Sequence, residues 1–219
     1  MEVSPAVTPI KPRLRGVTHQ WAFFVSLVAG SALLVLAPGR KAALAAAIYA
    51  VSLSALFGTS ALYHRITWRP SARRWMRRLD HSMIFLLIAG TYTPFCLLVL
   101  RGGIANTVLA VVWGGALGGI LLKLLWIDAP KWLVAAVYVA LGWVAVAATP
   151  QILDHAGAVA LGLVLAGGLL YTAGAVVYAV RRPDPVPAVF GYHEVFHALV
   201  IGAAALHYAA VAFFALPGG

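Results

Sequence analysis

Long apolar runs separated by short polar segments dominate the chain. Runs of about 18 apolar residues or more are long enough to cross the hydrocarbon core of a bilayer, about 30 Å thick, as a helix. The connections between them are short, so helices that follow one another in sequence are expected to lie antiparallel. The pattern predicts an all-α fold, a seven-transmembrane helical bundle. The seven runs are 21–37, 42–63, 81–100, 104–125, 132–149, 157–180 and 194–216.

Composition supports a single membrane domain. The 219 residues are 63% hydrophobic and 10% charged, which is far too apolar for a soluble globular domain. No segment remains for a separate soluble domain, so we predict a basic cytoplasmic N-terminal tail at 1–20 and a seven-helix membrane domain at 21–219 of a multi-pass protein of the cell (cytoplasmic) membrane. Cys96 is the only cysteine and lies within the third run, which excludes an intrachain disulfide.

The positive charge is distributed asymmetrically. If the connections alternate across the membrane, thirteen Lys and Arg residues fall on one side and only Arg40, Lys41 and Arg101 on the other. The positive-inside rule then predicts a cytoplasmic N-terminus and a C-terminus outside. Trp68 and Trp75, within the Arg-rich 65–78 connection, fit an interfacial segment. The net charge of +10 therefore indicates membrane lipids as partners and no nucleic acid.

Polar side chains converge at the cytoplasmic end of the predicted bundle. His64 ends the second run, Asp80 opens the third, and His193 and His197 open the seventh. Ser60 and His64 are spaced i, i+4, as are His193 and His197, so each pair lies on one helix face. Three imidazoles from two helices match a zinc site with an open fourth position. Asp80 could hold or deprotonate a water there, and Ser60 could orient a ligand.

Simpler interpretations exist for each of these residues. A histidine near the end of a span is often interfacial, Asp80 could cap the N-terminus of the third helix, and the Ser60 hydroxyl could bond a carbonyl of its own helix. Polar residues within spans are costly and tend to mark function, which favours the metal site.

The remaining histidines carry weaker predictions. His19 and His155 are expected at the membrane interface. His81 directly follows Asp80 and points about 100° around the helix from it, so packing or interfacial contact is predicted. His207 lies deeper in the last run, on roughly the face of His193, and is predicted to hydrogen-bond within the bundle or to line a cavity.

The stretch HEVFH at 193–197 also matches the His-Glu-x-x-His signature of zinc metalloproteases. Those enzymes take a third ligand from further along the chain, but Glu194 is the last acidic residue. His207 lies ten residues beyond His197, about 15 Å along the same helix, which is too far to share one ion. The third ligand must therefore come from upstream, where His64 is the best candidate, and a protease is not indicated.

Four stretches resemble the bacterial hemolysin III branch of the progestin and adiponectin receptor superfamily: SALYHR at 60–65, LDHSMIFLLIAGTYTPF at 79–95, ALGW at 140–143 and HEVFHALVIGAAALHY at 193–208. The resemblance implies a seven-helix bundle with a cytoplasmic N-terminus. It also implies a zinc ion bound by His64, His193 and His197, with Asp80 and Ser60 near the metal. It assigns no role to Glu194.

The resemblance leaves three functions open. The first is zinc-dependent, ceramidase-like hydrolysis of a lipid amide or ester in membrane lipid homeostasis, with Asp80 transferring the proton. The second is a zinc-stabilised membrane regulator without chemistry of its own. The third is a cytolytic pore, against which no run carries a stripe of charged or amide residues. A lipid-accessible cavity at Asp80 would separate the first from the second, and neither the substrate nor the oligomeric state is predicted.

Overall fold

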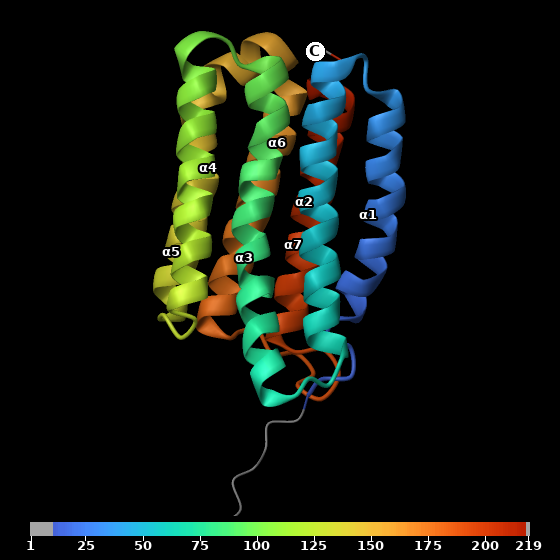
Figure 1. The fold of residues 1–219 in the computed structure, drawn as a ribbon, viewed down its shortest axis with the longest axis vertical. Coiled ribbons are helices and arrows are strands. Elements are labelled where there is room, and N and C mark those ends of the chain that lie inside the picture. The colour runs from blue at the N-terminus through green and yellow to red at the C-terminus, as the bar shows by residue number, and fades with distance from the viewer. Residues whose placement is uncertain (1–10, 218–219) are drawn as a thin grey trace, which may run out of the picture.

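The helices run side by side along one axis (Figure 1) in a computed structural model that describes residues 11–217. Within these residues the structure contains no β-strand, only an isolated bridge between Val186 and Phe190. Each apolar run of the sequence falls on one helix or on a helix with its short extension. In chain order the elements are α1 (Val17–Leu36), α2 (Arg40–Arg65), α3 (Pro70–Pro94), the π-helix η1 (Phe95–Val99), α4 (Gly102–Leu125), α5 (Lys131–Gly142), the 3-10 helix η2 (Trp143–Ala148), α6 (Thr149–Val180), α7 (Tyr192–Ala210) and the π-helix η3 (Val211–Ala215).

The surface of the bundle is apolar, as expected for a protein surrounded by lipid. Large apolar side chains project outward, including Val28 and Val35 of α1, which are 74% and 84% exposed. Within residues 11–217, six helical stretches are long and apolar enough to cross a membrane. One of them, Lys131–Val180, is 50 residues long and comprises α5, η2 and α6. The chain is therefore a multi-pass membrane protein.

The long Lys131–Val180 stretch is not straight. Gly157 has φ 86° and ψ 170°, outside the helical region, and so breaks α6 near its start. A residue with a side chain would rarely adopt this conformation, which glycine tolerates. Beyond the break, α6 runs back along the bundle and packs against α5.

Helices that follow one another in sequence are also neighbours in space. α1 packs on α2, α2 on α3, α3 on α4 and α6 on α7, while α1 also contacts α7. Gly90 of α3 lies so close to α2 that a Cβ atom there would be 2.7 Å from Cβ of Ser52. Small residues allow membrane helices to approach in this way. The packing brings the end of α2 and the starts of α1, α3 and α7 together at one end of the bundle (Figure 1).

The start of α3 differs from the prediction. The segment 65–78 was expected to be a connection, but only residues 66–69 lie outside the helices, and α3 begins at Pro70. Proline suits the first turn of a helix because it lacks only an N–H that would be unpaired there. Asp80 consequently lies about three turns inside α3, whose N-cap is Arg69. The interpretation of Asp80 as a helix cap is therefore wrong.

Candidate metal centre

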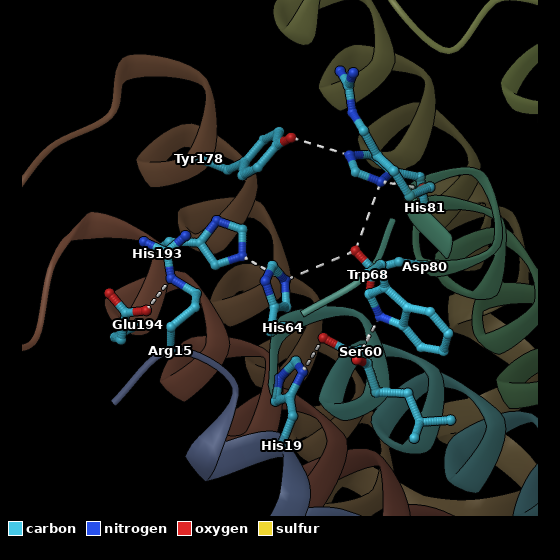
Figure 2. A network of polar contacts seen from close by, with 12 residues as sticks. Arg15, His19, Ser60, His64, Trp68, Asp80, His81, Tyr178, His193 and Glu194 are labelled. Carbon is cyan, nitrogen blue, oxygen red and sulfur yellow. Dashed lines mark hydrogen bonds and ion pairs between the residues drawn. The ribbon is translucent and has the colours of Figure 1, made fainter. Parts of the chain in front are cut away.

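Three histidines meet at the end of the bundle where α2 finishes and α7 begins. His64 lies in the last turn of α2, and His193 and His197 lie in the first two turns of α7. Their ligand-capable atoms all lie within 4.8 Å of one another. Nε2 of His193 is 3.1 Å from Nε2 of His64 (Figure 2). The structure thus brings together the three residues that the sequence predicted as metal ligands.

The donor set fits a metal ion. Zinc binds imidazole nitrogens at about 2.0–2.1 Å in a tetrahedron, which places two such nitrogens about 3.4 Å apart. The 3.1 Å separation between His64 and His193 is close to that value. Three imidazole nitrogens are also the protein ligands of a zinc site that keeps an open fourth position.

Asp80 reaches the same place from α3. Its Oδ2 atom lies 4.0 Å from Nε2 of His64 and 3.7 Å from Nδ1 of His81 (Figure 2). Nε2 of His81 in turn lies 3.1 Å from the Tyr178 hydroxyl. The carboxylate therefore lies beside the histidine cluster, as predicted, with His81 on its other side. His81 was expected only to pack or to lie at the interface, and its contacts with Asp80 and Tyr178 were missed.

A cavity of about 130 Å³ opens from the cluster into the bundle between α3, α5, α6 and α7. Its polar end is lined by Ser60, Asp80, His193 and His197. The rest of its wall is largely apolar and extends as far as His207, whose Nε2 atom lies 3.0 Å from the carbonyl oxygen of Val164. His207 therefore both lines the cavity and hydrogen-bonds within the bundle, as the sequence predicted. Asp80 lines the polar end of this cavity.

His19 belongs to the site although an interfacial position was predicted for it. The side chain is 2% exposed, and its ring stacks on that of His197 with centroids 3.7 Å apart and planes 10° from parallel. Nδ1 of His19 lies 2.9 Å from Oγ of Ser60, so this hydroxyl contacts a side chain of another helix. The prediction was wrong because α1 begins at Val17, before the apolar run at residue 21.

Glu194, which received no role from the sequence, is fully buried and anchors the N-terminal segment. Its carboxylate pairs with Arg15 and accepts a hydrogen bond of 2.9 Å from the backbone N–H of Gly191. The Arg13 N–H donates to the carbonyl oxygen of Ala188 at 3.0 Å, which continues the attachment. Glu194 thus holds the chain before α1 against the start of α7. The glutamate of HEVFH is therefore engaged in an ion pair, whereas the glutamate of the metalloprotease signature serves as general base.

We expect Glu194→Gln to loosen this attachment while leaving any bound metal in place. Removing one partner of a buried ion pair typically costs about 3–5 kcal/mol, and partial exposure of Arg15 should place the loss near the lower end. Thermal unfolding in detergent should show a lower midpoint, and trypsin should cleave faster after Arg13 and Arg15. Asp184→Asn is the matched control, since Asp184 also accepts a backbone hydrogen bond at the start of α7 but is exposed. A large loss of metal in Glu194→Gln would instead make Glu194 part of the metal site.

Comparison with known proteins identifies similar chains. A family model described as Haemolysin-III related matches residues 7–208, a range that includes every predicted site residue. Hemolysin-3 of Bacillus cereus is 35% identical over 177 residues, covering 81% of this chain and 78% of the relative. The Hemolysin-3 homolog of Bacillus subtilis (strain 168) is 34% identical over 167 residues, covering 76% and 75%. The Monocyte to macrophage differentiation factor of Homo sapiens is 26% identical over 198 residues, covering 89% and 80%.

Proposed function

Because the chain belongs to the haemolysin-III related family, we propose that it is a zinc protein of the cell membrane that hydrolyses a lipid amide or ester and so acts in membrane lipid homeostasis. The observation that carries this proposal is the position of Asp80 and the histidine cluster at the polar end of a largely apolar cavity. Ligand sites typically combine an apolar wall with a few convergent polar groups.

His64, His193 and His197 would hold the zinc ion. When bound, zinc supplies a Lewis acid that polarises an acyl carbonyl and lowers the pKa of water. Asp80 accepts the proton of the attacking water and returns it to the amine or alcohol that leaves as the C–N or C–O bond breaks. His81 packs beside the carboxylate, with its Nδ1 atom 3.7 Å from Oδ2 of Asp80 and bonded to the carbonyl oxygen of Arg77 at 2.8 Å.

The cavity favours a lipid over a polar substrate. Ile84 and Leu87 of α3 and Val200 of α7 line it beyond the polar end. An acyl chain placed along this wall would bring its carbonyl group to the end where Asp80 lies. Metal analysis of the purified protein, together with fatty acid release from ceramide-like amides and phospholipids in liposomes, tests the proposal. A protein without zinc would contradict it.

We also propose that the chain crosses the membrane seven times, with its N-terminus in the cytoplasm and its C-terminus outside. The Lys131–Val180 stretch would cross twice, since α5 and α6 pack on one another and Gly157 breaks α6 near its start. The charge asymmetry of thirteen against three supports the orientation. The histidine cluster would then lie near the cytoplasmic face.

Reporter fusions provide the test of this topology. We expect alkaline phosphatase to be inactive when inserted in the 66–69 connection and active when fused after Gly219, because the enzyme matures only outside the cytoplasm. A fluorescent protein that folds only in the cytoplasm should show the opposite pattern. Insertion between Ala37 and Gly39, at the other end of the bundle, is the matched control and should give active phosphatase. Active phosphatase at 66–69 would reverse the proposed orientation.

A further inference from the structure

His19 occupies a buried position between two elements of the metal site. It lies in the first turn of α1, and its ring meets Phe57 of α2 edge-on at a centroid distance of 5.1 Å. The turn into α1 is made by Gly16 at φ 79°, where a Cβ atom would lie 2.6 Å from Cβ of His64. The chain therefore enters α1 directly against the end of α2, which places His19 between α2 and α7.

The His19 ring lies flat on a proposed metal ligand. Its plane is 10° from that of His197, whereas the rings of His64 and His193 meet His197 at 62° and 64°. A metal-bound histidine is usually held by a hydrogen bond from its other nitrogen to a carboxylate or carbonyl. Nδ1 of His197 has no such partner in the part of the chain that the structure describes. Stacking by His19 can supply the missing restraint on the orientation of this ring.

The His19 ring is itself held by Ser60. Other buried or helical serines, Ser31 and Ser52, donate to carbonyl oxygens of their own helices at 2.8 Å. The Ser60 hydroxyl instead lies 2.9 Å from Nδ1 of His19, across the interface between α1 and α2. This contact fixes the edge of the ring, while His197 and Phe57 contact its other sides. The ring of His19 is therefore restrained on several sides.

We propose that His19 is a positioning residue of the metal site, which holds the His197 ring in its metal-binding orientation by stacking and is itself anchored by Ser60. This inference rests on the proposed zinc site. The imidazole acts as a flat surface and does not bind the ion. A residue that only filled space could be replaced by a side chain without a ring face, whereas a residue that positions His197 by stacking could not.

Two substitutions separate the stack from the hydrogen bond. His19→Phe keeps a flat ring against His197 but loses the contact with Ser60, while His19→Asn keeps a polar group near Ser60 but loses the ring face. Zinc affinity of each folded variant is measured by competition with a chelating indicator. We expect His19→Phe to stay close to the wild type and His19→Asn to bind zinc about 10–100-fold more weakly, the usual effect of losing a group that orients a metal ligand.

Control variants show whether a change in zinc affinity is specific to His19. His155→Asn makes the same change at an exposed histidine away from the cluster and the cavity, and it should keep the wild-type affinity. If His19→Asn does not fold, His19→Leu replaces it, because leucine supplies bulk without a ring face and should show the same loss. Melting temperature is recorded for each variant, so that a change in affinity is distinguished from a change in stability.

The outcomes separate this inference from the function on which it rests. Equal zinc affinity in the wild type, His19→Phe and His19→Asn overturns the positioning role and leaves the zinc site intact. Weaker binding by His19→Phe than by His19→Asn also overturns it, because the ring face would then not be the feature that matters. An equal loss in His155→Asn overturns it too. A wild type that binds no zinc overturns the proposed site itself.

Discussion

We expect His64→Ala to leave the purified protein with almost no bound zinc, against about one ion per chain in the wild type. Zinc sites with an open position use three protein ligands, and removal of one leaves only the pair from α7. His64 is the one cluster member from α2, so its loss also removes the link that an ion would make between α2 and α7. Metal content per chain, measured by mass spectrometry after purification without added chelator, checks this expectation.

The matched control for this loss is His155→Ala. His155 is exposed and distant in sequence from the cluster, so its removal should leave the zinc content unchanged. His193→Ala and His197→Ala should behave as His64→Ala does. Full zinc retention in His64→Ala would show that the predicted ligand set is wrong, and Asp80, 4.0 Å from Nε2 of His64, would be the first residue to examine in its place.

The second large effect is expected for Asp80→Asn. Asparagine occupies nearly the same space and can hydrogen-bond, but it cannot accept the proton of an attacking water. Loss of general base catalysis typically lowers a rate by about 10²–10⁴-fold. The variant should therefore keep its fold and most of its zinc, while fatty acid release from ceramide-like amides or phospholipids in liposomes falls by that factor.

Asp128→Asn is the control for this experiment. Asp128 is an exposed carboxylate at the same end of the bundle, where it pairs with Arg77 at 2.8 Å, and its substitution should leave the rate unchanged. The result also separates the proposed hydrolase from a zinc-stabilised regulator. If the zinc-loaded wild type releases no fatty acid while Asp80→Asn still disturbs membrane homeostasis in cells, the hydrolase is wrong and the regulator takes its place.

The sequence by itself determined the helices and the family. In a bilayer every backbone polar group must be paired within the protein, so long apolar runs leave the helix as the available structure. Each predicted run is helical in the structure. The family resemblance drawn from the motifs around Ser60, Asp80 and His193 is confirmed by the match over residues 7–208. Helical spacing and the antiparallel order of the helices were also sufficient to predict that His64, His193 and His197 lie close together, as they do in the structure.

Helix boundaries were less predictable, because hydropathy detects the lipid-facing part of a helix and not its polar extension. α1 begins at Val17 and α3 at Pro70, both before their apolar runs. In each case the polar first turns are stabilised by the same backbone hydrogen bonds as the apolar part. The unpredicted turns are the ones that carry His19 and that place Asp80 inside its helix.

The contacts of His19 and Glu194 were decided only by the tertiary structure. They depend on the packing of α1 against α7, which brings Arg15 next to a residue 179 positions away along the chain. A largely apolar helix carries no amphipathic pattern to show which face turns inward, because lipid and protein interior are both apolar. The sequence could therefore predict that α1 exists, while only packing could turn His19 onto His197.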